Sequence, residues 1–185
     1  MPQNSLKREI YFHEDDYCQI QILPLSLWDY CLSEMNKINE FSNAHKAEIG
    51  WTDIYIREET PQNLTDLAIT VEEFKQSVEL TLKRYEKVTT GYSSHVEECE
   101  NCLAWGIEDR NFTIFADTNS KNLINAVWLE IGTLNRENSP VVTETFKNLP
   151  KSNELMIADW NWSNVAAIGN EKSLTDYLAQ HFDEE

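Results

Sequence analysis

The sequence predicts a single α+β domain, with a mostly antiparallel or mixed sheet and helices packed on it. Three observations lead to this prediction. The chain has 185 residues, enough for one sizeable core, and no linker rich in Pro, Gly or Ser divides it. Short runs of β-forming residues occur in neighbouring pairs, as in hairpins. Amphipathic stripes with helical spacing stand between them, an order that does not suit a doubly wound parallel fold.

The first pair of predicted strands is EIYFH (9–13) and YCQIQIL (17–23). Three acidic residues separate the two runs, which predicts a hairpin. Because side chains alternate along a strand, Cys18, Ile20 and Ile22 share one face. Cys18 is therefore expected to be a small core residue and not a reactive thiol.

A helix is predicted after Pro24, which ends the second strand. Ser26 is the expected N-cap, because an acid follows it three residues later. Cys31 lies beside the apolar stripe of this helix and is expected to be packed. The stripe consists of Leu25, Trp28, Leu32, Met35 and Ile38.

The run WTDIYIR (51–57) alternates between apolar and polar side chains and predicts a third strand. Ile54 and Ile56 fall on one face of it. We expect this strand to lie in one sheet with 17–23 and 103–116.

A long helix is predicted over 70–90. Its N-terminus carries the capping box Thr70-x-x-Glu73, and Gly91 is the expected stop. Glu79 and Lys83 are expected to pair on its wet face. Its apolar stripe consists of Val71, Phe74, Val78, Leu82 and Tyr85.

The second half of the chain is predicted to be rich in strands. LAWGI and FTIFA flank the four residues EDRN as a hairpin. LINAVWLEI is apolar enough for a strand or a helix, and its β-branched content and the Gly132 stop favour a strand. A helix is expected from Asn138-Ser139-Pro140. The predicted elements are strands at 103–107, 112–116, 123–131, 154–160 and 165–168, and helices at 138–148 and 173–182.

The chain is strongly acidic. It has 15 Lys and Arg against 32 Asp and Glu, a formal charge of −17. Binding to nucleic acid depends on cationic side chains that release counterions, so nucleic acid is excluded as a partner, and an anionic membrane surface is excluded too. A basic protein partner is favoured, because opposite charge steers encounter. The alternative is that the charge serves solubility alone.

The chain is predicted to be cytoplasmic. Its N-terminus has no apolar core of a signal peptide, and no run of residues is apolar enough to span a membrane. Four cysteines in this compartment are expected to be reduced thiols.

The stretch HVEECENC (95–102) has the residue types of a metal site. Cys99 and Cys102 have the spacing of one zinc knuckle, and His95 is a third candidate ligand, but no second pair supplies a fourth. Zinc at these three residues is kept as an alternative. Glutamates surround the cysteines and disfavour a thiolate, so a reactive redox pair is not expected. The favoured interpretation is an acidic loop whose cysteines tuck under a hairpin.

No catalytic residue and no cofactor is predicted. Zinc deaminases have a His-x-Glu half followed by a Cys-x-x-Cys half. Both halves occur here in that order, but they are too close in the sequence for a strand to lie between them, so a deaminase site is not predicted. The chain has no phosphate-binding, dinucleotide-binding or hydrolase motif, and only five glycines. The cluster at 13–16 could bind a cation or serve as acid and base, but acids at a hairpin tip are usually only solvated.

Two function classes remain. The first is an interaction protein that neutralises a basic partner such as a toxin or nuclease domain. Its expected contacts are Glu14, Asp15, Asp16, Glu97, Glu98 and Glu100, on predicted turns. In composition alone, the chain resembles the immunity proteins that neutralise bacterial toxins. The second class is a small enzyme or ligand-binding domain with a site assembled from scattered residues. A deep pocket with convergent polar groups favours the second, and a shallow acidic face favours the first.

Overall fold

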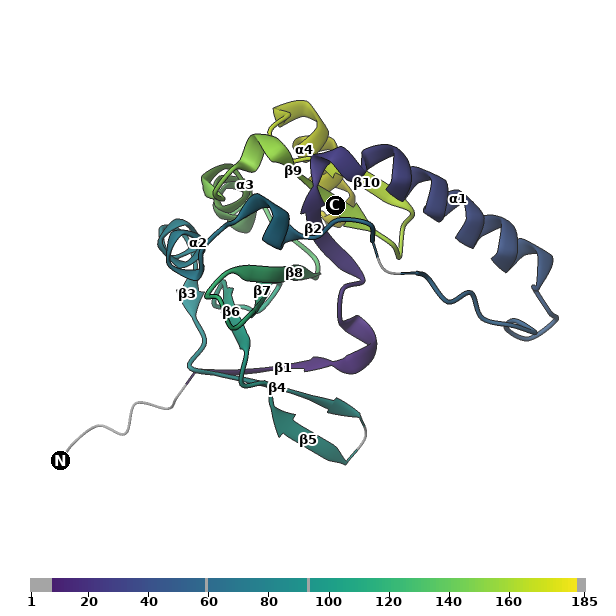
Figure 1. The fold of residues 1–185 in the computed structure, drawn as a ribbon, viewed down its shortest axis with the longest axis horizontal. Coiled ribbons are helices and arrows are strands. Elements are labelled where there is room, and N and C mark those ends of the chain that lie inside the picture. The colour runs from purple at the N-terminus through teal and green to yellow at the C-terminus, as the bar shows by residue number, and fades with distance from the viewer. Residues whose placement is uncertain (1–7, 59, 93, 183–185) are drawn as a thin grey trace.

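The computed structural model describes residues 8–58, 60–92 and 94–182. These residues form a single α+β domain with two mostly antiparallel sheets, so the predicted fold class is confirmed (Figure 1). Residues 1–7, which begin the stretch that lacks a signal peptide's apolar core, lie outside the described part. No helix within the described residues is long and apolar enough to cross a membrane.

The larger sheet has seven strands, and all its neighbours are antiparallel. In spatial order they are β10 (Asn164–Ala167), β9 (Leu155–Asp159), β2 (Ile20–Pro24), β8 (Ile124–Ile131), β7 (Phe112–Thr118), β6 (Cys102–Gly106) and β3 (Lys83–Arg84). Strands β6, β7 and β8 follow one another as a meander, of which the sequence predicts the hairpin of β6 and β7. Strand β2 is inserted between the late strands β8 and β9, so the first part of the chain completes the sheet.

The smaller sheet has three strands and lies beside the β6 end of the larger one (Figure 1). Its middle strand is β4 (Lys87–Tyr92), which pairs in parallel with β1 (Glu9–His13) and antiparallel with β5 (His95–Glu98). Short turns of 3-10 helix connect several elements, of which η1 (Glu14–Asp16) joins the two sheets.

Four helices cover the larger sheet: α1 (Trp28–Ala44), α2 (Val71–Val78), α3 (Asn138–Asn148) and α4 (Glu171–Leu178). Because side chains alternate along a strand, the buried residues of the larger sheet fall into separate clusters on its two faces. In β9, Leu155 and Ile157 join the cluster that also buries α2, α3 and α4, while Met156 and Ala158 join a second cluster with α1. Helices α2, α3 and α4 therefore cover one face, and α1 covers part of the other.

The small sheet covers the rest of that second face. Phe115 and Trp128, on β7 and β8, stack at 5.2 Å between ring centres, and Phe12 of β1 meets both edge-on. Ile10, Tyr85 and Val88 are buried in the same cluster. An aromatic cluster thus joins the two sheets.

The predicted hairpin of 9–13 and 17–23 is wrong. Both runs are strands, but β1 pairs with β4 and β2 pairs with β8 and β9. The three acids between them form η1, and Cys18 has a positive φ of 57°, so the chain leaves one sheet and enters the other. The thiol of Cys18 is buried as predicted, in the aromatic cluster and not beside Ile20 and Ile22.

Helix α1 forms where predicted but does not use Ser26 as its cap. A turn of 3-10 helix precedes it, Leu27 is the N-cap, and no side chain caps the helix. The hydroxyl of Ser26 donates instead to Gln62 Oε1 at 2.7 Å. Cys31 is fully buried, as expected.

The predicted strand at 51–57 is also wrong. In the described structure these residues form no strand, and only Trp51 makes a single bridge, to Lys46. Ile54 and Ile56, the expected buried face, are 82% and 86% exposed. The alternation is real, but Tyr55 and Arg57 are the side chains that face the protein.

The predicted helix at 70–90 is too long. Its capping box is confirmed, since Thr70 Oγ1 accepts from Glu73 N at 3.2 Å and Thr70 N donates to Glu73 Oε2 at 3.0 Å. The helix ends at Val78, and β3 and β4 follow. Leu82 and Tyr85 are still buried, but in different clusters: Leu82 lies in the cluster that buries α2, α3 and α4, and Tyr85 lies in the aromatic cluster.

The expected pair of Glu79 and Lys83 is absent for the same reason. Glu79 accepts from the indole of Trp105 at 3.1 Å, and Lys83 pairs with Glu108. Gly91 lies within β4, with φ 148°, and a Cβ there would collide with the carbonyl of His95. The glycine thus permits the close approach of β5 and does not end a helix.

Candidate functional site

The first predicted acidic cluster lies on η1, between the two sheets. Glu14, Asp15 and Asp16 are all exposed. His13 caps this turn, because its Nδ1 accepts from the backbone N of Asp15 at 3.2 Å. The short turn follows from the sequence, since three consecutive acids have no apolar side chain to bury.

The second predicted acidic cluster lies on and after β5. Every residue of β5 is exposed, so Glu97 and Glu98 are solvated, and Glu100 follows in an exposed turn. Glu98 pairs with Lys87 at 3.4 Å across the small sheet. Glu97 and Glu100 form no ion pair within the described residues.

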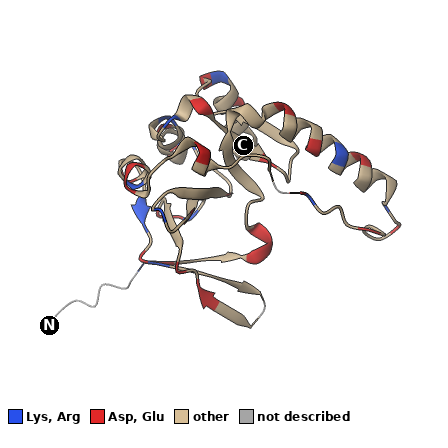
Figure 2. Cartoon of the chain, viewed as in Figure 1, with Lys and Arg blue, Asp and Glu red and all other residues tan. Residues whose placement is uncertain are grey.

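The fold brings the two clusters to the same end of the molecule (Figure 2). Glu14 and Glu97 line one cavity of about 270 Å³, together with Gly91, His95 and Val96. Glu14 also lines a second cavity, of about 370 Å³, whose wall includes Tyr17 and Asp117. Asp15, Asp16, Glu98 and Glu100 line neither cavity, so the structure joins the clusters at Glu14 and Glu97 and not at every predicted residue.

Exposed tyrosines lie near the acidic clusters, and they are not among the contact residues predicted from the sequence. Tyr11, Tyr17 and Tyr92 are 42%, 44% and 59% exposed. Tyr11 donates to the carbonyl of Gly91 at 2.7 Å, and the ring of Tyr92 meets His13 edge-on at 5.2 Å. The alternation of exposed Tyr11 with buried neighbours in β1 is the signal that could have found it.

We call this surface the acidic face. It consists of Glu14, Asp15, Asp16, Glu97, Glu98 and Glu100 with Tyr11, Tyr17 and Tyr92.

Two titratable groups beside the acidic face have raised pKa values. Burial raises the pKa of Glu130, on β8, to about 7, and the nearby charge of Asp16 adds to the rise. Burial also raises the pKa of Tyr17, with Cys18 and Asp117 acting in the same direction. Desolvation is the main cause of both shifts, and the neighbouring carboxylates of Asp16 and Asp117 add to it.

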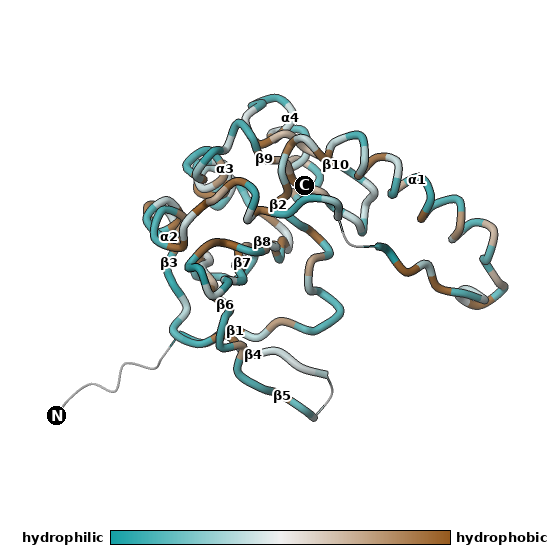
Figure 3. The backbone as a smooth tube through the Cα atoms, in the orientation of Figure 1, coloured by the Kyte–Doolittle hydropathy of each residue, from teal (hydrophilic) through white to brown (hydrophobic). Residues whose placement is uncertain are grey.

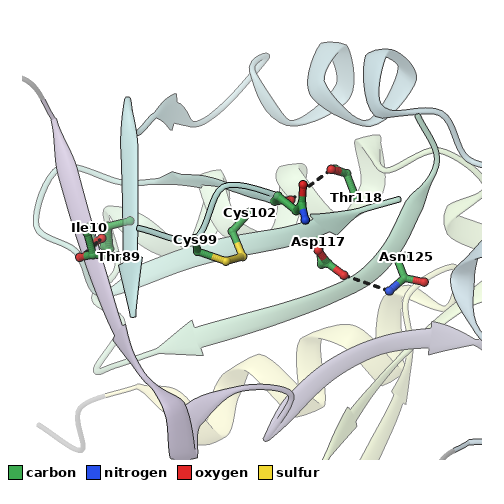
Figure 4. The surroundings of a disulfide bond; sticks show 8 residues. Ile10, Thr89, Cys99, Cys102, Asp117, Thr118 and Asn125 are labelled. Atoms are coloured by element: carbon green, nitrogen blue, oxygen red, sulfur yellow. Dashed lines mark hydrogen bonds between the residues drawn. A yellow bond between two sulfur atoms is a disulfide. The ribbon is translucent and has the colours of Figure 1, made fainter. Parts of the chain in front are cut away.

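The cysteines of HVEECENC are joined in a disulfide, Cys99–Cys102, with their Cα atoms 5.3 Å apart (Figure 4). The prediction that all four cysteines are reduced is therefore wrong for this pair. Cys99 N donates to the carbonyl of Val88 at 3.0 Å, and both residues pack against the aromatic cluster. The sequence did not predict the bond, because a separation of three positions is equally suited to a free pair.

The bonded cysteines also bear on the alternative zinc site of His95, Cys99 and Cys102. Zinc binds thiolates, and the two sulfurs here are bonded to each other. His95 is exposed on β5. No group of three or more His, Cys, Asp or Glu within the described residues is arranged to hold a metal ion. The two cysteines do line the larger cavity of the acidic face.

A third cavity, of about 480 Å³, is a candidate small-molecule site. Gln21, Arg57, Asn63 and Asn125 contribute polar groups to its wall. Most of these groups already have protein partners: Gln21 Oε1 accepts from Trp160 at 2.8 Å, Asn63 caps a turn, and Asn125 donates to Asp117 at 2.9 Å. Their geometry is explained by the fold, and a ligand would have to compete for them.

Comparisons with protein families, curated proteins and solved structures give no significant match to this chain.

Proposed function

We propose that this protein binds and inhibits a positively charged protein, of the toxin or nuclease class, through the acidic face. The observation that carries the proposal is the junction of two acidic clusters, far apart in the sequence, at the shared cavity of Glu14 and Glu97. A partner meets both clusters at once there. The chain's net charge of −17 extends the same attraction to long range.

The exposed tyrosines support a protein as the partner. Aromatic side chains supply contact area with little loss of conformational freedom, and tyrosine is enriched at the centres of interfaces. Tyr11 is already held by its bond to Gly91, so it loses less freedom on binding. Carboxylates around such anchors meet Arg and Lys of the partner.

Inhibition follows from the chemistry of a basic partner. A nuclease binds the phosphate backbone with cationic side chains, and those groups are satisfied equally well by carboxylates. A bound acidic face therefore occupies the surface that nucleic acid needs. The alternative, a small enzyme or ligand-binding domain, is favoured by the 480 Å³ cavity. A small carboxylate that raised the melting temperature of the wild type, but not of an Arg57→Gln variant, would support it.

The experiment begins with a pull-down from the source cell and identification of the partner. Association is then measured by stopped flow between about 50 and 500 mM salt, where screening shortens from roughly 14 to 4 Å. Two variants remove the acids: E14Q/D15N/D16N and E97Q/E98Q/E100Q. We expect each to slow association at low salt by about tenfold and to weaken its salt dependence.

The matched control removes the same number of charges from helices on the opposite face of the larger sheet, in the variant E72Q/E144Q/D176N. All three of these side chains are exposed. It should associate nearly as fast as the wild type, and all three variants should melt within a few degrees of it, since exposed charges contribute little to stability. An acidic or small-molecule partner, or equal slowing by the control, would show that the proposal is wrong.

A further inference from the structure

The segment after α1 forms an arm along that helix. At the end of α1 the chain reverses in a tight turn, in which Ala47 N donates to the carbonyl of Gly50 at 3.0 Å and Thr52 N to that of His45 at 2.8 Å. Gly50 has a positive φ of 75°, which suits a glycine. Residues 53–58 then run back beside α1 in an extended path (Figure 1).

The polar side chains of this segment hold it against the protein. The hydroxyl of Tyr55 donates to Glu34 Oε2 at 3.0 Å, and its ring meets Phe41 edge-on at 5.5 Å. The guanidinium of Arg57 lies 4.0 Å from the ring centre of Trp160. Alternate side chains are therefore anchored, and the segment has a fixed inner side.

The outer side of the segment is apolar and exposed. Ile54 and Ile56 are 82% and 86% exposed, and Ile49 and Trp51 in the preceding turn are 92% and 64% exposed. Figure 3 shows hydrophobic and hydrophilic positions alternating along this segment. Large apolar side chains that lie together on the surface of a folded chain typically mark an interaction site.

The backbone of the segment is also unpaired. No backbone–backbone hydrogen bond among the described residues involves 54–58, and the amide of Ile54 is bonded only to the side chain of Asp53, at 2.8 Å. An extended run with free N–H and C=O groups and alternating side chains is what strand addition uses.

From these observations we propose that residues 53–58 are a docking strand, which pairs with an extended and basic segment of the partner protein. The proposal rests on the proposed function for the charge of that partner. The partner's apolar side chains lie against Ile54 and Ile56, and its backbone completes the hydrogen bonds of the segment.

The charges around the docking strand select a basic occupant. Exposed acids lie in the turn and in the segment itself, at Glu48, Asp53 and Glu58, and the adjacent helix α1 carries further acids (Figure 2). Of the cations, Lys37 pairs with Glu34 and Arg57 stacks on Trp160, which leaves Lys46 as the exposed cation of the turn. A second copy of this chain would bring the same acids and a charge of −17 against them.

The docking strand is continuous with the acidic face. Arg57 and Glu58 line the 480 Å³ cavity, and so does Tyr17. Tyr17 also lines the 370 Å³ cavity beside Glu14. One partner can therefore cover both surfaces, with its basic body on the acidic face and an extended segment on the arm.

The test uses the full chain and an eight-residue peptide that alternates Val and Lys. At a peptide concentration about ten times its Kd, we expect amide hydrogen exchange at residues 55–57 to slow about tenfold. A Val–Glu peptide of the same length should have no effect, because the surrounding acids repel it. A Val–Lys peptide with N-methylated backbone amides should also fail, because it lacks the donors of a pairing strand.

Variants test the side chains. Ile54→Ser with Ile56→Ser should abolish the protection, whereas Leu80→Ser, which changes another exposed apolar residue at 72%, should retain it. No protection by the Val–Lys peptide, or equal protection by the Val–Glu peptide, overturns the proposal. Protection in concentrated protein alone, with a dimer in sedimentation, also overturns it, because the occupant is then a second copy.

This outcome is separable from that of the proposed function. The variants E14Q/D15N/D16N and E97Q/E98Q/E100Q should leave the peptide's protection of 55–57 unchanged. If the peptide binds but no basic partner exists, the proposed function alone is wrong. If a basic partner binds the acidic face and is indifferent to Ile54→Ser with Ile56→Ser, the docking strand alone is wrong.

Discussion

The bond between Cys99 and Cys102 encloses a very short loop. In the chain-entropy account, a disulfide stabilises by restricting the unfolded chain, and a loop of this size gives only about 2 kcal/mol. We therefore expect Cys99→Ser with Cys102→Ser to lower the free energy of unfolding by about 2 kcal/mol or less, as measured by urea denaturation.

Reduced wild type is the control for this pair, and it should lose a similar amount. Elemental analysis of the reduced protein, purified without added metal, tests the zinc alternative. Stoichiometric zinc that disappears together with stability in the double variant would contradict our interpretation of the loop.

Glu130 is half-buried on β8 and gives the stability a pH dependence. Burial and Asp16 raise its pKa from 4.5 to about 7 in the folded protein. The folded state therefore binds the proton more tightly than the unfolded state, and stability falls as pH rises from about 4.5 to 7.

Glu130→Gln removes this titration. Relative to the wild type, the variant should gain stability progressively between pH 4.5 and 7 and then hold a constant advantage. Urea denaturation across this pH range measures the difference. Glu144→Gln, at an exposed position on α3, is the control. A difference between the Glu130 variant and wild type that does not change with pH would contradict the assignment.

Among the elements, α2 is short but central to the core. Phe74 is 2% exposed, and its ring lies 5.8 Å from that of Trp105 on β6. Phe74→Ala should cost about 3–5 kcal/mol, since it removes a large buried side chain and leaves a cavity. Chemical denaturation measures this loss. A loss below about 1 kcal/mol would show that the helix does not pack as described.

The length of α2 shows that an apolar stripe predicts where a helix lies but not where it ends. The capping box depends on residues three positions apart, and it forms as expected. The end of the helix depends on β3 pairing with β6, in which Lys83 is opposite Gly106. This pairing partner lies more than twenty residues further along the chain, so the local pattern does not show it. The helix predicted from the apolar stripe is therefore too long.

The segment beside helix α1 is a second case in which a local sequence pattern does not determine the structure. The side chains at 51–57 do alternate. However, Tyr55 bonds to Glu34 on α1, and Arg57 stacks on Trp160, which follows β9. Alternation predicts two faces and does not decide which face is buried when the polar side chains have specific partners.

At the scale of the whole molecule, the aromatic cluster joins the two sheets. Phe12 is 4% exposed and contacts both Phe115 and Trp128. Phe12→Ala should therefore cost about 3–5 kcal/mol. Tyr11→Phe, at the neighbouring exposed position, removes one hydrogen bond and should cost about 1 kcal/mol.

The same measurements test whether the chain is one cooperative domain. Tryptophan fluorescence and far-UV circular dichroism should give coincident unfolding transitions for the wild type and for both variants. An early, separate transition in Phe12→Ala would show that the small sheet unfolds by itself.

The sequence by itself determined the features that depend on near neighbours. The hairpin of β6 and β7, strands β8, β9 and β10, and helices α3 and α4 all form where the sequence predicts them. Turn residues, capping groups and periodicity decide such elements within a few residues. The same local information predicted two acidic clusters on exposed turns. Both clusters are exposed, but Glu97 and Glu98 lie on strand β5 and not on a turn.

Only the tertiary structure decided how these pieces are arranged. Strand β1 pairs with β4, β2 enters between β8 and β9, and Glu14 comes to share a cavity wall with Glu97. Each of these contacts joins residues far apart in the chain, and its free energy comes from the burial of whole faces of the sheets against each other. No short window of sequence contains both partners of such a contact. The joining of the two acidic clusters in the acidic face and the exposure of the docking strand could therefore not be predicted from the sequence.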